Sequence, residues 1–170
     1  RGNGNVPMFE GVNWYEWDAN GYYAGEYSAE VTISEVLADT GVMAESARSA
    51  AEVDAQVAIL KEATGLTDAE IVKAPFLHQT VDGYSLAYQP GTVNGVLLDE
   101  DNYVSPEPHG PIIGGKDIFK QQLETALGAY GYTVRWVENW ALYHALMGEV
   151  HCGSNAVREI PETKWWETGR

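Results

Sequence analysis

Cys152 is the single cysteine of the chain, and its surroundings are the part of the sequence most able to do chemistry. Gly148 and Gly153 bracket it, and glycines let the backbone approach a ligand closely. A cysteine beside a histidine, among exposed backbone N–H donors, can have a lowered pKa and act as a nucleophilic thiolate. A lone cysteine can equally be a small buried hydrophobe. The residues by themselves leave both interpretations open.

Histidines are the usual proton carriers for such a thiol, and the chain has four of them. Residues 149–159 are expected to form a strand, on which neighbouring side chains point to opposite faces. His151 is therefore expected to pack behind Cys152 and to be a poor proton shuttle for it. His144 is expected near the site without direct contact. The other two lie in loop-like contexts and are interpreted as structural or solvated: His78 and His109.

No metal site is predicted in this chain, because the histidines and Cys152 lack the spacing of metal ligands. The acidic run at 99–101 could attract a cation, but it is expected to be a solvated turn. A single cysteine also excludes an internal disulfide.

The start of the chain is rich in glycine and aromatic residues and shows little periodicity. Residues 1–31 are therefore expected to form loops and short strands whose rings pack on the core. Residues 32–35 have the sequence of a capping box, which predicts a helix over about 32–39. Gly41 is expected to stop that helix.

A longer helix is expected next. Ser46 is predicted to be its cap, and apolar residues at helical spacing carry it to Lys61 or beyond. Gly65 is expected to end it. Residues 67–70 form a second capping box, which predicts one or two further helical turns.

The second half of the chain alternates strands with one main helix, so the expected fold class is α/β. Residues 93–98 are a mostly apolar run that predicts a buried strand. The main helix is expected to face inward through Phe119, Leu123 and Leu127. The predicted elements are strands at 84–88, 93–98, 133–138 and 149–159, a helix at 116–127 and a short helical stretch at 139–146.

Charge limits the partners of the chain. Its net charge of −15 repels phosphate backbones, so nucleic acid is not an expected partner. A basic partner, such as an arginine-bearing peptide, would be attracted. The same charge also serves solubility.

Length and hydropathy limit the class of protein. At 170 residues the chain is one domain or part of a larger one. No apolar run approaches the roughly 20 residues that cross a bilayer, so neither a membrane span nor a signal peptide is predicted. The chain opens at Arg1 without an initiator methionine, which is compatible with proteolytic processing or with a sequence that is part of a longer one, and secretion is expected.

The segment from Gly148 to Asn155, with the sequence GEVHCGSN, resembles the catalytic-cysteine motif of the protein-arginine deiminases. These enzymes are a branch of the guanidino-group-modifying (pentein) superfamily. The resemblance is continuous over about 58–168 and poor over 1–57. Further segments agree with the family in order and spacing. Residues 90–98 resemble the strand before the family's last helix, and residues 110–115 resemble the loop into that helix. Residues 138–144 resemble the approach to the cysteine, and residues 164–166 resemble the end of the chain.

This resemblance implies that residues 1–170 are the C-terminal portion of a pentein-type α/β propeller. It implies a reaction in which the Cys152 thiolate attacks the guanidinium carbon of a peptidyl arginine. Ammonia leaves, a covalent thiouronium remains, and water activated by a histidine releases citrulline. Guanidinium is a poor electrophile, so a strong nucleophile is needed, and carboxylates are needed to hold the planar cation.

The rest of the family's catalytic set is not found in this sequence. In the family, the histidine, two guanidine-binding aspartates and the calcium ligands lie upstream of the matched segment. The chain alone is therefore expected to be inactive, with an upstream segment or a second polypeptide completing the site. Calcium is possible on that missing part, and no cofactor is assigned here.

Leu146, Met147 and Gly148 are the predicted substrate-binding residues. The first two occupy positions that line the substrate entrance in the family, where some relatives carry arginine and histidine. Their apolar character implies weaker contacts to acidic groups of the substrate and a more permissive entrance. The alternative is that they only pack the loop before the cysteine.

Two alternative functions remain open. One is another guanidine-acting cysteine enzyme, either a deiminase of free arginine or an amidinotransferase. The other is a non-catalytic binding module that keeps the fold. The intact segment around Cys152 argues against the second alternative.

Overall fold

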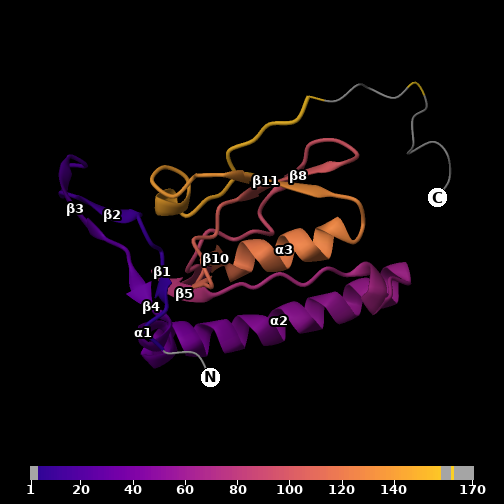
Figure 1. The fold of residues 1–170 in the computed structure, drawn as a ribbon, viewed down its shortest axis with the longest axis horizontal. Coiled ribbons are helices and arrows are strands. Elements are labelled where there is room, and N and C mark those ends of the chain that lie inside the picture. The colour runs from indigo at the N-terminus through magenta and orange to yellow at the C-terminus, as the bar shows by residue number, and fades with distance from the viewer. Residues whose placement is uncertain (1–3, 158–161, 163–170) are drawn as a thin grey trace.

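Helices and small sheets alternate in the computed structural model, which describes residues 4–157 and 162 (Figure 1). The predicted α/β class is confirmed. No sheet of the described residues is closed, so the propeller remains a proposal. The elements of the N-terminal half are β1 (Pro7–Met8), β2 (Asn13–Trp17), β3 (Tyr23–Ser28), β4 (Val31–Thr32), α1 (Ile33–Ala38), α2 (Thr40–Thr64) and the 3-10 turn η1 (Asp68–Glu70). Those of the C-terminal half are β5 (His78–Val81), β6 (Tyr84–Ala87), β7 (Val96–Leu97), β8 (Asn102–Pro106), β9 (Ile112–Ile113), β10 (Lys116–Asp117), α3 (Ile118–Gly128), β11 (Thr133–Val137) and the 3-10 turn η2 (His144–Leu146).

Helix α1 begins where the sequence predicts, and the capping box is confirmed. The backbone N–H of Glu35 donates to Thr32 Oγ1 at 3.3 Å, and the Glu35 carboxylate accepts the Thr32 N–H at 2.7 Å. The predicted stop at Gly41 is wrong. Asp39 ends α1 and also caps α2, because its carboxylate accepts the backbone N–H groups of Gly41 and Val42. The second helix therefore follows the first without a loop.

Ser46 lies inside α2, so its predicted role as a cap is wrong. Its hydroxyl instead accepts the backbone N–H of His78 on β5 at 2.9 Å. The adjacent Glu45 accepts Thr80 of β5 at 3.1 Å, while its hydrogen bonds to Arg48 hold its pKa at about 2, well below the ordinary value. These polar contacts fix the hairpin β5–β6 on α2.

Gly65 ends α2 in the left-handed conformation, with φ of 77°, as predicted. An alanine methyl group there would meet no atom within 4 Å, but the residue would have to keep a positive φ. Gly65→Ala is therefore expected to lower the free energy of unfolding by about 1 kcal/mol. Gly128, the last residue of α3, also has open space but no positive φ, so Gly128→Ala should be neutral or stabilising. Urea denaturation measures both, and equal losses would contradict the argument.

The largest sheet has the order β11–β8–β7. Strands β8 and β11 are parallel, and the connection between them passes through β9, β10 and α3. Leu123 of α3 is only 3% exposed, and Glu124 of the same helix accepts the indole N–H of Trp136 on β11 at 2.8 Å. The predicted helix and the alternating strand after it are thus confirmed, and they pack on each other (Figure 1).

The predicted buried strand at 93–98 is wrong in both length and burial. Only the two residues of β7 pair, antiparallel to β8. Leu97 is 57% and Leu98 is 67% exposed. The physical reason is position: β7 lies at the edge of its sheet, and no further strand of the described residues covers it.

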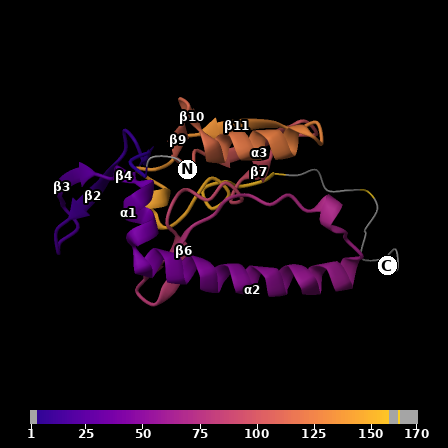
Figure 2. The ribbon, with the colours of Figure 1, turned by 60° about the horizontal axis from the view of Figure 1, so that its bottom comes forward.

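The core joins the N-terminal part of the described chain to Trp140, which follows β11. Its buried members are Met8, Phe9, Ala29, Val36, Val42 and Trp140. Trp140 is 1% exposed, and its indole N–H donates to the Asn13 carbonyl at 2.9 Å. Figure 2 shows α2 along one side of the molecule with α1 running across its start. No helix of the described part combines the length and apolar character needed to cross a bilayer.

Candidate active site

Cys152 lies in a turn, so the predicted strand over 149–159 is wrong for its described part. The backbone N–H of Gly153 donates to the Glu149 carbonyl at 3.0 Å, and that of Ser154 donates to the His151 carbonyl at 3.1 Å. Bonds within the segment replace those of a sheet, because the glycine-flanked backbone folds back on itself. Residues 158 and 159 lie outside the described part.

The sequence predicts that His151 lies behind Cys152, because neighbouring side chains of a strand face opposite ways. In a turn that expectation no longer applies. His151 is exposed, and its backbone N–H donates to the Asn94 carbonyl at 3.0 Å. The contact joins the cysteine turn to the loop between β6 and β7. It also brings the side chain of Asn94 to the thiol.

The Cys152 thiol is exposed rather than sealed in apolar side chains. Asn94 Nδ2 donates to its Sγ at 3.2 Å. This hydrogen bond is the main cause that lowers the pKa of Cys152 below its ordinary value, and the Glu149 backbone adds to it. Burial and the negative charge of Glu149 act in the opposite direction. A thiol that is exposed and acidified in this way has the properties of a nucleophile.

Asn94→Ala is expected to raise the pKa of Cys152, because the thiolate loses its amide donor. At pH 7 the thiolate fraction falls, and alkylation by iodoacetamide should slow by about tenfold, since a hydrogen bond to a charged group is worth roughly 1.5 kcal/mol. The pH dependence of the alkylation rate, followed by intact mass, measures the effect. Asn20→Ala, in the turn between β2 and β3, is the control. An unchanged profile in Asn94→Ala would contradict the assignment.

A buried carboxylate lies beneath the turn. Glu149 is 4% exposed and accepts three donors: Asn139 Nδ2 at 2.6 Å, His144 Nδ1 at 2.8 Å and the backbone N–H of Gly91 at 3.4 Å. Three donors from the surrounding chain thus hold this one carboxylate in place. The sequence alone predicts no role for Glu149, Asn139 or Asn94. The only available signal was that polar residues recur in a segment otherwise rich in aromatic and apolar ones.

Of the predicted substrate-binding residues, Gly148 lies next to the thiol, and the other two have exposed side chains. Leu146 and Met147 are 69% and 66% exposed. A Cβ atom at Gly148 would lie 3.3 Å from the Cys152 Cβ and 3.9 Å from its Sγ. Met147 has a positive φ of 65°, so the chain turns sharply just before this close approach. Both apolar side chains are thus available to a ligand, and a side chain at 148 would crowd the cysteine.

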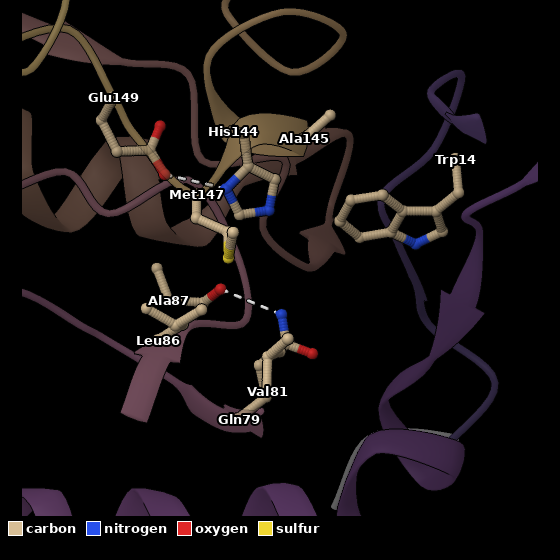
Figure 3. Close-up of a pocket in the computed structure, with 9 residues that line it drawn as sticks. All are labelled: Trp14, Gln79, Val81, Leu86, Ala87, His144, Ala145, Met147 and Glu149. Carbon is tan, nitrogen blue, oxygen red and sulfur yellow. Dashed lines mark hydrogen bonds and ion pairs between the residues drawn. The ribbon is translucent and has the colours of Figure 1, made fainter. Parts of the chain in front are cut away.

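A pocket of about 270 Å³ opens beside Met147 (Figure 3). His144 Nε2 is buried and has no hydrogen-bond partner in the described structure, while Nδ1 of the same ring points to Glu149. With Nδ1 donating, a neutral ring presents a lone pair at Nε2 to a donor. The lining residues are Trp14, Gln79, Val81, Leu86, Ala87, His144, Ala145, Met147 and Glu149.

The other polar candidates have structural surroundings. His78 is half-buried on β5 rather than in a loop, and His109 Nε2 lies 2.6 Å from Glu138. The acidic run at 99–101 is an exposed turn, as predicted, in which Asp99 accepts the backbone N–H of Asp101. Among residues 4–157 and 162, no group of three or more His, Cys, Asp or Glu side chains could hold a metal ion.

The comparisons with known proteins all indicate the same family. The family model for protein-arginine deiminase matches residues 1–167, including the first 57, where the resemblance by inspection was poor. The chain is 31% identical over 168 residues to protein-arginine deiminase type-1 of Mus musculus and 32% identical over 166 residues to that of Homo sapiens. It is 29% identical to protein-arginine deiminase type-3 of Mus musculus over 166 residues.

These alignments cover 97–98% of the chain but only 23% of each relative. The chain thus spans less than a quarter of the length of the curated relatives it matches. Residues 164–166, which resemble the family's C-terminal end, lie outside the described part of the structure. By its family match and by this similarity over nearly its whole length, the chain belongs to the protein-arginine deiminase family.

Proposed function

We propose that the complete protein containing this chain converts peptidyl arginine to peptidyl citrulline, with Cys152 as its nucleophile. The observation that carries the proposal is the exposed Cys152 thiol, which accepts a hydrogen bond from Asn94 at 3.2 Å and has a lowered pKa. Family membership supports the substrate class, because the similar proteins are named for action on protein arginine.

The proposed reaction has two steps. First, the thiolate sulfur bonds to the guanidinium carbon of the substrate, and one nitrogen leaves as ammonia after it takes up a proton. A thiouronium remains on Cys152. In the second step a water oxygen bonds to that carbon, the carbon–sulfur bond breaks, and citrulline and the thiolate are released. The proton transfers need a histidine, which we place on protein outside this chain.

The missing part of the site is proposed to come from an upstream segment or a second polypeptide. It would supply the histidine, two aspartates for the guanidinium and any calcium ligands, and it would complete a pentein-type propeller. The exposed apolar edge strand β7 supports this, because an uncovered edge with Leu97 and Leu98 at its surface is a natural pairing site for further chain. Secretion is part of the proposal and is supported by the acidic character of the sequence.

The substrate entrance is proposed to include Leu146, Met147 and the backbone of Gly148. The exposure of the two side chains and the nearness of Gly148 to the thiol support this role. Two apolar side chains give an acidic group on the substrate nothing to pair with. The protein is thus expected to accept arginine in varied peptide contexts.

The test compares citrulline formation from a blocked arginine peptide and from free arginine, with the complete protein. Intact mass of the same preparation shows whether a second polypeptide is present. The proposal expects the peptide to be the preferred substrate. Preference for free arginine would assign the protein to another guanidine-acting class. No citrulline from either substrate would favour a binding module.

A further inference from the structure

We propose that Glu149 is a positioning residue that, together with His144, holds Asn94 against the Cys152 thiol. The inference rests on the proposed function, since it concerns the same cysteine. It adds a role for a buried carboxylate that does not touch the reacting atoms itself.

The burial of Glu149 and His144 supports this role. The side chains of Glu149 and His144 are 5% and 3% exposed, yet both are polar. Burying a carboxylate is costly unless it is fully hydrogen-bonded, and Glu149 meets this need with donors from three places in the chain: Asn139, His144 and Gly91. A polar centre buried so completely specifies one arrangement of the segments it joins.

A closed ring of hydrogen bonds around the thiol also supports it. The Glu149 carboxylate binds the backbone N–H of Gly91, and the Gly91 carbonyl accepts the backbone N–H of Asn94 at 2.9 Å. The Asn94 carbonyl then accepts the N–H of His151, and the Asn94 side chain donates to Cys152. The N–H of Gly153 returns to the Glu149 carbonyl. Displacing Glu149 therefore moves the loop that carries Asn94.

Charge and geometry predict opposite effects, which makes the role testable. As a nearby negative charge, Glu149 raises the pKa of Cys152. As an anchor for Asn94, it keeps in place the donor that lowers the same pKa. Removal of the charge alone should therefore speed thiol alkylation, whereas removal of the anchor should slow it. The other titratable side chains next to the turn are His144, His151 and Tyr143, and all of them are kept in the variants of Glu149.

The experiment measures iodoacetamide alkylation of Cys152 against pH in the complete protein. Glu149→Ala removes all three hydrogen bonds and is expected to slow alkylation at pH 7 by about tenfold. Glu149→Gln keeps an oxygen that accepts from Gly91 and His144. The Asn139 amide can turn so that its oxygen accepts from the new NH₂ group. Alkylation of this variant should therefore not be slowed. Glu62→Ala, on the exposed side of α2, is the matched control.

A second pair of variants keeps the test decisive if Glu149→Ala does not fold. His144→Leu removes one donor to the carboxylate and should slow alkylation by about fivefold. His144→Asn places an amide N–H where Nδ1 stood and should restore most of the rate. Folded Glu149→Ala or His144→Leu protein that alkylates as fast as the parent, or faster, would overturn the inference.

Alkylation needs only the thiol, whereas citrulline formation needs the whole catalytic set. If the variants change alkylation as expected but the parent protein forms no citrulline, the positioning role stands and the enzymatic proposal fails. If the parent forms citrulline and the Glu149 and His144 variants leave the alkylation profile unchanged, the positioning role alone fails.

Discussion

Replacement of Cys152 by alanine is expected to abolish citrulline formation, with a loss of at least about a thousandfold in rate. The loss is this large because the sulfur forms the covalent bond on which both chemical steps depend. Cys152→Ser is expected to be equally inactive, since a serine hydroxyl is a far weaker acid than a thiol and is not ionised near neutral pH. Citrulline formation from an arginine peptide measures the loss in the complete protein.

Labelling with a haloacetamidine provides an independent readout of the same prediction. The parent protein should gain one label on Cys152, seen by intact mass, and Cys152→Ala should gain none. Ser154→Ala, which removes one hydroxyl from the same turn, is the control and should still be labelled, because its hydroxyl bonds the His151 carbonyl and not the thiol. Full activity in Cys152→Ala would show that the nucleophile lies elsewhere.

Trp140→Ala is expected to be the most destabilising change in the described core, with a cost of about 3–5 kcal/mol in the free energy of unfolding. The indole is 1% exposed, and its ring lies 5.0 Å from that of Phe9 and 4.6 Å from that of Trp14. The ring of His144 lies 4.8 Å away. Alanine would leave a cavity between the N-terminal strands and the segment that leads to the cysteine.

Urea denaturation of the complete protein, followed by circular dichroism, measures this cost. Trp17→Ala is a matched control, because Trp17 is 61% exposed on β2 and should cost less than about 1 kcal/mol. Because Trp140 also contacts His144, we expect the first variant to perturb the site as well as the core. Similar costs for the two tryptophans would contradict the core described here.

Helices were the part of the fold that the sequence predicted best. The capping box at Thr32, the end of α2 at Gly65 and the inward face of α3 all follow from residues within one or two turns of each other. Such signals are local, because a cap or a left-handed glycine acts on its own helix. The predictions at Gly41 and Ser46 are wrong because the Asp39 side chain caps α2 earlier in the chain.

Burial and pairing were predicted less well. The apolar run at 93–98 has the composition of a central strand, yet β7 is a short edge strand in the described structure. The segment around Cys152 alternates like a strand but forms a turn. In both cases the local pattern specifies a tendency, and the presence or absence of a partner strand decides the outcome.

The sequence by itself determined the family of this chain, the identity of its one cysteine and the presence of its helices, because these depend on residue types and short spacings. Only the tertiary structure decided that the thiol is exposed, that Asn94 donates to it across 58 positions of sequence, and that Glu149 is buried beneath it. Those facts depend on hydrogen bonds between segments far apart in the chain. A side chain's partners there are set by how the whole backbone packs, and no local pattern records them.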